Sequence, residues 1–267
     1  GYQAAKMRIF QNQTEKDVAI IGFDDEITQS IAIGLSANGP ARVVQASSTY
    51  ALGRGVSAVD GRLYDSNSGQ AQFVGNLSDC MALPGRHNHQ NAAAAYAACR
   101  ALGLDPQTIM DGIRTFPGLA HRLEMVGEID GVKFVNDSKA TNAEAAEQAL
   151  KAYKKAYWIA GGVSKAEGIQ PLAPLFPNIT KAYLIGDSEE TFAATLKGKV
   201  ALQTCGTLEN AVQAAFRDAK VVGDENPVIL LSPACASFDQ FRDFEHRGDV
   251  FRSIVQSMMP QELKELA

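Results

Sequence analysis

The sequence predicts an α/β fold in which a mostly parallel sheet domain at the C-terminal end follows part of another α/β domain. After residue 118, short apolar runs alternate with helical segments, and this alternation is typical of βαβ units in a parallel sheet. Before it, strand-like runs give way to a pair of helical segments. The breaker pair Pro117–Gly118 separates the two patterns and predicts domains over 1–117 and 118–267. With 267 residues, 46% of them hydrophobic, the chain is long enough to bury two cores.

The N-terminal part begins with Gly1 to Phe10, which looks like the end of a helix entering a strand. It has no initiating Met and no N-terminal cap signal, so we expect a truncated or cleaved product. Apolar or alternating runs bounded by turn-forming residues predict strands or hairpins at 17–23, 41–47, 55–65 and 71–77. An Ala-rich stretch from Asn91 predicts a helix, and Pro106 is placed to begin a second one.

The C-terminal part contains five runs that are typical of buried strands, at 132–137, 156–162, 182–187, 201–206 and 228–234. Helical segments lie between most of them, at 141–153, 189–196 and 208–219. In such sheets ligands bind beyond the carboxyl ends of the strands. The loops that leave those ends are polar and carry Asp137, Ser138, Lys139, Gly161, Gly162, Ser164, Lys165, Gly186, Asp187, Ser188, Ser232, Ser237 and Asp239.

Charge and composition narrow the classes of partner. A formal net charge of -5 argues against a general nucleic-acid or membrane binder, because those surfaces need clustered Lys and Arg. The four cysteines form no CxxC pair and lie at no zinc spacing, and reduced thiols fit the cytosol. No apolar run approaches the roughly 20 residues of a membrane span. We therefore expect a cytoplasmic protein whose partners are small molecules.

Two glycine-containing segments partly match the phosphate-binding motifs of nucleotide-binding proteins, but each lacks a feature that the motif requires. Residues 34–41 have two glycines at the spacing of a phosphate loop, but Pro40 and Ala41 stand where Lys and Ser or Thr are needed. Gly53 and Gly55 precede a predicted hairpin, so no helix N-terminus follows them to hold a pyrophosphate. An NAD-binding domain is correspondingly disfavoured, and no hydrolase or metalloprotease motif occurs.

Two segments carry polar clusters directly before predicted helices, at 85–95 and 135–145. The residues alone favour helix capping by Asn91, Thr141 and Asn142, since these side chains lie beside unpaired backbone N–H groups. Ligand binding is the alternative.

Motifs spread over the whole chain resemble those of the Mur ligase family, most of all its D-glutamate-adding members. These motifs are YQAAKMRIF, LPGRHNHQN, LAHRLE, NDSKATN and LLSPACASFDQFRDFEHRGDVF, in the family's order and with compatible spacing. The resemblance implies the rear part of the central ATPase domain, followed by a Rossmann-like domain that binds the amino acid. It also implies the reaction: ATP phosphorylates the carboxylate of UDP-N-acetylmuramoyl-L-alanine, and the amine of D-glutamate attacks the acyl phosphate, with Mg²⁺ neutralising the phosphates.

By the same resemblance, six residues are expected to contact ATP. Asn88 and Asn91 match the asparagines beside the adenine, and His121 borders the nucleotide. Arg122 and Lys139 face phosphates and Asp137 the ribose hydroxyls. The alternatives are a salt bridge at the domain boundary for Arg122 and a solvated loop for Asp137 and Lys139.

Five residues match family positions that hold D-glutamate, namely Thr141, Lys165, Ser237, Phe238 and Phe244. Lys165 is expected to clamp the side-chain carboxylate, while Phe238 and Phe244 form apolar walls. Phe238 departs from the family, which often has Leu there, and a plain core role is the alternative for both phenylalanines.

Lys6 falls where Mur ligases carry a carbamylated lysine that binds magnesium, so Lys6 and Lys139 are the expected catalytic residues. An ordinary solvated lysine is the alternative for Lys6, and we expect it to be unmodified in a fragment.

We expect the chain to be a monomeric, inactive part of a D-glutamate ligase. A second hypothesis is a non-catalytic ligand-binding module that has lost its phosphate loop. A third is a Mur or folylpolyglutamate ligase that adds another amino acid. A phosphate loop encoded upstream of Gly1 favours an enzyme, whereas a native start codon there favours the module.

Overall fold

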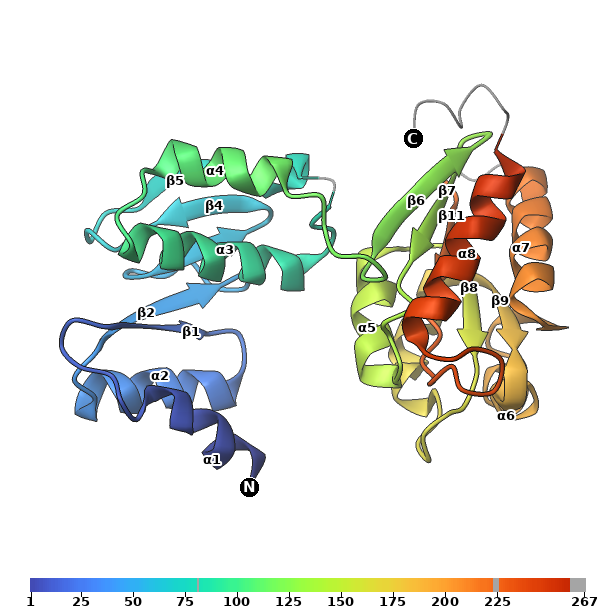
Figure 1. The fold of residues 1–267 in the computed structure, drawn as a ribbon, viewed down its shortest axis with the longest axis horizontal. Helices are drawn as coiled ribbons and strands as arrows, with labels where there is room; N and C mark the ends of the chain where they lie inside the picture. The colour runs from blue at the N-terminus through green and yellow to red at the C-terminus, as the bar shows by residue number, and fades with distance from the viewer. Residues whose placement is uncertain (81, 223–225, 260–267) are drawn as a thin grey trace. The chain divides into compact units, whose positions relative to one another are not determined.

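The computed structural model describes residues 1–80, 82–222 and 226–259, and the chain divides into two compact units, Gly1–Pro117 and Gly118–Ala267 (Figure 1). The division falls at the Pro117–Gly118 breaker pair. In the described residues, each cluster of buried apolar side chains belongs wholly to one unit. The two units therefore have separate cores, and each is described by itself.

The N-terminal unit is built on a five-stranded sheet with the order β1-β2-β3-β4-β5. Its strands are β1 (Val18–Gly22), β2 (Arg42–Ser47), β3 (Val56–Val59), β4 (Arg62–Asp65) and β5 (Gln72–Asn76). The first three are parallel and the last three antiparallel. All five agree with the predicted strand positions, because turn residues bound each apolar run.

Helices of this unit include two that differ from the sequence predictions. They are α1 (Tyr2–Met7), α2 (Glu26–Asn38), α3 (Arg86–Ala101) and α4 (Pro106–Thr115), with short 3-10 turns at Arg8–Phe10 and Leu77–Asp79. The helix α2 was not predicted. The helix α3 begins five residues before Asn91, so the prediction that Asn91 caps it is wrong. Gly85, with φ of 86°, ends the preceding loop, and nothing in Arg86 to Gln90 opposes helix formation.

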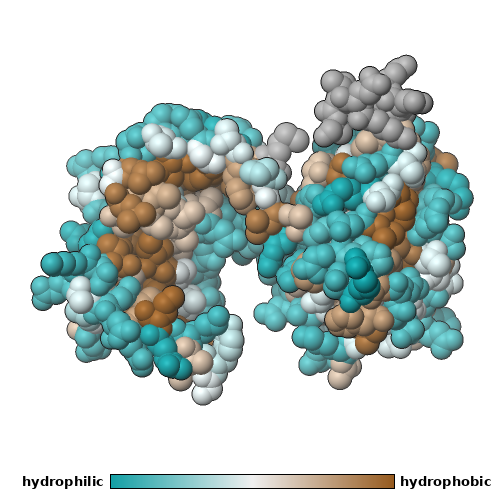
Figure 2. Space-filling model, in the orientation of Figure 1, coloured by the Kyte–Doolittle hydropathy of each residue, from teal (hydrophilic) through white to brown (hydrophobic). Residues whose placement is uncertain are grey.

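The N-terminal unit leaves several large apolar side chains exposed. They are Tyr2, Ile9, Ile27, Ile33, Tyr50, Phe73, Leu102, Leu104 and Phe116. Figure 2 shows hydrophobic residues on the visible face of this unit, over α3, β1 and β2. Within the described ranges, the structure contains no helix long and apolar enough to cross a membrane.

The C-terminal unit has a six-stranded sheet with the order β10-β9-β8-β11-β7-β6. Its strands are β6 (Glu124–Ile129), β7 (Val132–Asn136), β8 (Ala156–Gly161), β9 (Ile179–Ile185), β10 (Ala201–Gly206) and β11 (Val228–Leu231). All pairs are parallel except β6 with β7, which confirms the predicted mostly parallel sheet. The sequence analysis predicted β7 but missed β6, which precedes β7 across the turn Asp130–Gly131.

Helices cover both faces of this sheet (Figure 1). They are α5 (Ala143–Ala152), α6 (Glu189–Leu196), α7 (Leu208–Val222) and α8 (Phe244–Met258), with 3-10 segments at Gln170–Asn178 and Gly186–Ser188. Neighbouring residues of a strand belong to different cores: Val135 and Trp158 pack on the α5 side, Phe134 and Tyr157 on the side of α7 and α8. This alternation is what a strand buried on both faces requires.

Candidate functional site

Three loops at the carboxyl ends of β7, β8 and β11 are tied together by backbone hydrogen bonds. The Asp137 amide donates to Leu231 O over 2.7 Å, and the Gly161 amide donates to Pro233 O over 3.0 Å. Val163 and Ala236 exchange a further pair of amide bonds, at 2.9 and 3.0 Å. The polar loops predicted from the sequence therefore form one continuous edge.

The loop after β9 joins this edge through Asp239. Its Oδ2 accepts a hydrogen bond from the Asp187 amide, 3.1 Å away. Gly186 lies directly against the same carboxylate, since a Cβ there would come within 2.0 Å of it, and its φ is 67°. Only glycine fits at this point.

Asp137 is a buried carboxyl group and not part of a solvated loop. Its Oδ2 accepts from the Ser232 hydroxyl over 2.7 Å, and its Oδ1 accepts from the Leu123 amide over 3.3 Å. Burial raises the pKa of Asp137 to about 7, although both hydrogen bonds and the nearby Arg122 charge lower it. The solvated-loop alternative is therefore wrong for this residue.

Lys139, Phe244 and His121 come together at this edge. The Lys139 Nζ lies 3.7 Å from the centre of the Phe244 ring, which is a cation–π contact. The His121 ring meets the same phenyl ring edge-on, with centroids 6.2 Å apart. The Lys139 amide also donates to His121 O over 3.0 Å, so backbone and side chains place the three residues jointly.

His121 is largely buried, with 7% of its surface exposed. Its Nδ1 lies 3.1 Å from Asn136 Nδ2, and its Nε2 lies 3.7 Å from Asp249 Oδ1. Gly248 of α8 packs against the ring, where a Cβ would come within 2.1 Å of Nδ1. In this arrangement the ring faces protein groups, while the adjacent Arg122 side chain is exposed.

The predicted D-glutamate ligands take different positions along the edge. Ser237 is buried and Lys165 is exposed, whereas Thr141 and Phe244 are half-buried. Phe238 is 72% exposed, so its core alternative is wrong.

The helix α5 begins beside these residues. Asn142 caps it by accepting from the Ala145 amide over 2.8 Å, which confirms the capping prediction for Asn142. Thr141 precedes the cap, so the capping prediction for Thr141 is wrong.

The predicted ATP and metal residues of the N-terminal unit lie on two helices. Asn88 and Asn91 share one face of α3, where Asn91 Nδ2 donates to Asn88 Oδ1 over 3.4 Å. Lys6 is exposed on α1, with its Nζ 5.4 Å from the centre of the Tyr2 ring. Across the described ranges, no three His, Cys, Asp or Glu side chains gather as a metal site.

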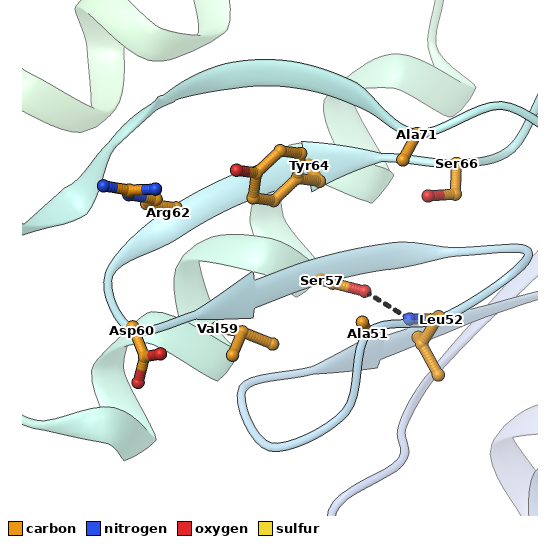
Figure 3. Close-up of a pocket in the computed structure, with 9 residues that line it drawn as sticks. All are labelled: Ala51, Leu52, Ser57, Val59, Asp60, Arg62, Tyr64, Ser66 and Ala71. Atoms are coloured by element: carbon orange, nitrogen blue, oxygen red, sulfur yellow. Dashed lines mark hydrogen bonds between the residues drawn. The ribbon is translucent and has the colours of Figure 1, made fainter.

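Several hollows open on the surface of the described residues, among them one on the N-terminal unit and a smaller one beside Lys165. The larger, of about 600 Å³, runs along the β3–β4 hairpin, with Ser57 and Val59 on β3 and Arg62 and Tyr64 on β4 (Figure 3). It contains none of the predicted site residues. The smaller, of about 280 Å³, is lined by Lys165 together with Asn142 and Leu172, and also by Glu144, Glu147 and Glu167.

The sequence placed Ser138 and Ser232 on the polar edge without a role, and it did not single out Arg247, although all three build the edge. The hydroxyl of Ser138 donates to Phe244 O over 2.8 Å and accepts from Arg247 Nε over 2.9 Å. The sequence pattern could have indicated that Arg247 is buried, because Arg247 falls on the same helical face as the buried Phe251 and Val255. A charged residue on an apolar helix face is unusual.

Two family descriptions match this chain. The Mur ligase middle domain matches residues 1–99, and the glutamate ligase domain of Mur ligases matches residues 121–235. The chain belongs to the Mur ligase family. The predicted family is thereby confirmed.

Relatives within the Mur ligase family are named as D-glutamate ligases. The UDP-N-acetylmuramoylalanine--D-glutamate ligase of Caulobacter vibrioides is 55% identical over 97% of this chain. The ligase of the same name from Rhodospirillum rubrum is 52% identical over 97% of the chain. The chain spans 55% and 54% of these two relatives, about half of their length.

Two solved structures share the fold. UDP-N-acetylmuramate-alanine ligase of Thermotoga maritima superposes with a TM-score of 0.60 at 17% identity, over 97% of this chain and 55% of that one. The E. coli FolC complex with DHPP and ADP gives 0.61 at 20% identity, over 96% of this chain and 57% of that one.

Proposed function

We propose that this chain is the D-glutamate-binding part, with half of the ATPase part, of an enzyme that adds D-glutamate to UDP-N-acetylmuramoyl-L-alanine in peptidoglycan synthesis. The observation that carries the proposal is the 55% identity to a ligase of that name across 97% of the chain. The polar edge of the C-terminal sheet supports it with the residue types that the reaction needs. We also propose that the enzyme acts as a monomer in the cytoplasm, where ATP is made.

The phosphoryl-transfer half of the reaction needs cations at the phosphates and partners for adenine and ribose. We assign Arg122 and Lys139 to the phosphates, and His121 to the border of the nucleotide. The cation–π contact with Phe244 holds the Lys139 ammonium in place, and Arg122 is exposed to incoming ligand. Asn88 and Asn91, adjacent on α3, are assigned to adenine.

Asp137 is assigned to the ribose hydroxyls. Each of its oxygens accepts one hydrogen bond within the chain and keeps a lone pair for a ligand O–H. Magnesium, when bound, neutralises the phosphates. Lys6, if carbamylated, is the one ligand that we assign to it in this chain.

The amide-forming half of the reaction needs a pocket that orients a dicarboxylic amino acid. We assign the side-chain carboxylate of D-glutamate to Lys165 and Thr141, and the rest of the molecule to Ser237 and Phe244, with Phe238 as an outer wall. In the described residues, no carboxylate lies within ion-pair distance of Lys165, so its ammonium is available. The three glutamates of the adjoining hollow repel a dicarboxylate, so the proposed pose lies on the Ser237 side of Lys165.

Calorimetric titration of the chain with D-glutamate tests the amino-acid site. Lys165→Ala and Ser237→Ala are expected to weaken binding roughly tenfold or more, the range for hydrogen bonds to charged groups. Lys154→Ala is the matched control, because Lys154 is an exposed lysine away from the edge. Equal affinity in the unaltered chain and both site variants contradicts the assignment.

Activity and specificity measurements separate the rival functions. The 267 residues contain no phosphate loop, so we expect no amide product from ATP when this chain acts alone. Product formation by the chain alone contradicts that expectation. Binding of L-alanine or meso-diaminopimelate in preference to D-glutamate favours another ligase specificity. Binding of none of the three favours a module with a different ligand.

A further inference from the structure

Arg247 is a fully buried cation behind the polar edge of the C-terminal sheet, with 0% of its surface exposed. Its Nε donates to the Ser138 hydroxyl over 2.9 Å. Its Nη2 donates to Ser138 O over 2.8 Å and to Cys235 O over 3.1 Å. Its Nη1 is buried without a hydrogen-bond partner among the described residues. Among the residues that the structure describes, the guanidinium thus binds only backbone and hydroxyl oxygens.

The charge of Arg247 is stabilised by the Asp239 carboxylate, which lies beyond ion-pair distance. In the part of the chain that the structure describes, no carboxylate lies within ion-pair distance of Arg247. Burial lowers the pKa of Arg247 to about 10, so the side chain is still charged at neutral pH. A buried cation without an ion-pair partner carries a desolvation cost, which the hydrogen bonds of Arg247 to three oxygens offset in part. These hydrogen bonds also link the loop after β7 to the loop after β11.

The contacts of Arg247 join three segments that carry proposed ligand residues. Ser138 lies between Asp137 and Lys139 in the loop after β7. Cys235 lies two residues before Ser237 in the loop after β11. The Ser138 hydroxyl, which accepts from Arg247, donates in turn to the carbonyl of Phe244 at the start of α8.

We propose that Arg247 is a positioning residue that fixes these three segments relative to one another, and so sets the geometry of the D-glutamate and phosphate ligands. This proposal rests on the proposed function. Arg247 itself is buried and touches no ligand. Misplacement of a site by about 1 Å can cost roughly a hundredfold in rate, so a side chain that fixes such loops has a large effect from a distance.

Two variants of the full chain test the proposal. Arg247→Met removes the charge and all donors, and Arg247→Lys keeps the charge and part of the hydrogen bonding. We expect Arg247→Met to fold with a lower melting temperature, because three buried oxygens lose a donor, and to bind D-glutamate roughly ten- to a hundredfold more weakly. Arg247→Lys is expected to regain part of the affinity. Arg217→Met, at an exposed position of α7, is the matched control and should bind normally.

Amide NMR spectra of the ligand-free chain give a readout that is independent of binding. In Arg247→Met the resonances of Lys139, Ser237 and Phe244 should shift together, and those of the N-terminal unit should not. Normal affinity in a folded Arg247→Met overturns the proposal, as do unshifted resonances. If Arg247→Met does not fold, normal affinity in Arg247→Lys overturns it. Failure of both variants to fold also overturns it, because Arg247 is then a folding residue.

Absence of D-glutamate binding by the unaltered chain is a different result. It refutes the proposed function, while the NMR comparison still decides whether Arg247 fixes the three segments.

Discussion

Asp137 has a carboxyl group whose protonation is coupled to folding. Its pKa is about 7 in the folded chain, against a usual 3.8, because burial penalises the ionised form. The folded state therefore binds this proton more tightly than the unfolded state does. The contribution of Asp137 to the free energy of unfolding consequently falls as pH rises from about 4 to about 7.

Asp137→Asn is expected to raise the melting temperature at pH 8 by more than at pH 5. The asparagine carries no charge, and the Ser232 hydroxyl can rotate to accept from its amide. From the shift in pKa, the gain in unfolding free energy should be on the order of 2 kcal/mol larger at pH 8. Thermal melts at both pH values measure this difference.

Asp60→Asn is the matched control, because it also removes one carboxylate. Asp60 lies at an exposed hairpin turn, and asparagine tolerates its positive φ of 49°. A gain for Asp137→Asn that is equal at both pH values contradicts the assignment of a raised pKa to Asp137.

At the level of single residues, the sequence allowed only part of the edge to be predicted. Lys139, His121 and Phe244 were predicted through motifs, and the structure brings them together. Ser138 and Ser232 were placed on the edge, but their burial and hydrogen-bond partners were not predicted, because a serine in a polar loop looks the same whether it is solvated or buried. Their role depends on partners about a hundred residues away in the chain, at separations of 106 and 95 residues.

At the level of elements, apolar strands were easier to predict than edges and helix starts. The strand β6 was missed because it lies at the edge of the sheet, carries Glu124 and Glu128, and has an irregular register at Gly127. The start of α3 was misplaced because the polar residues before Asn91 were interpreted as a loop. Local composition does not show whether a run of polar residues belongs to a loop or to the first turn of a helix.

The helix α8 gives a test of packing at this scale. Gly248 of α8 lies against His121, and an added Cβ would come within 2.1 Å of the ring nitrogen. Since His121 is held by Asn136, it cannot simply move away. Gly248→Ala should therefore destabilise the chain by about 1–3 kcal/mol, the usual cost of overpacking.

A glycine in another helix provides the control for Gly248→Ala. Gly112 of α4 has no atom within 4 Å of the position of a Cβ, so Gly112→Ala should stabilise its helix by up to about 1 kcal/mol. Urea unfolding of both variants measures the two free energies. Stabilisation by Gly248→Ala would show that His121 is not fixed against α8.

At the level of the whole molecule, the two units are separate in chain order and in core. The breaker pair Pro117–Gly118 could be recognised from the sequence because proline and glycine end regular structure in any context. In the described residues, every strand of each sheet pairs only within its own unit. The sequence did not reveal which side chains the N-terminal unit leaves exposed, since exposure depends on packing between distant elements.

Residues 118–267 should consequently fold without the N-terminal unit. Both apolar clusters on the two faces of their sheet draw only on this segment, and a domain of about 150 residues buries enough surface to be stable. The proposed D-glutamate ligands Thr141, Lys165, Ser237 and Phe244 also lie within it.

The isolated segment is expected to unfold cooperatively, because its core lies wholly within it. Its affinity for D-glutamate should be within about twofold of that of the whole chain, because the proposed ligands also lie within it. Circular dichroism melts and calorimetry, run beside the whole chain, measure both properties. Non-cooperative unfolding of the segment would mean that its core depends on residues 1–117. Cooperative unfolding with a large loss of affinity would mean that part of the D-glutamate site belongs to the N-terminal unit.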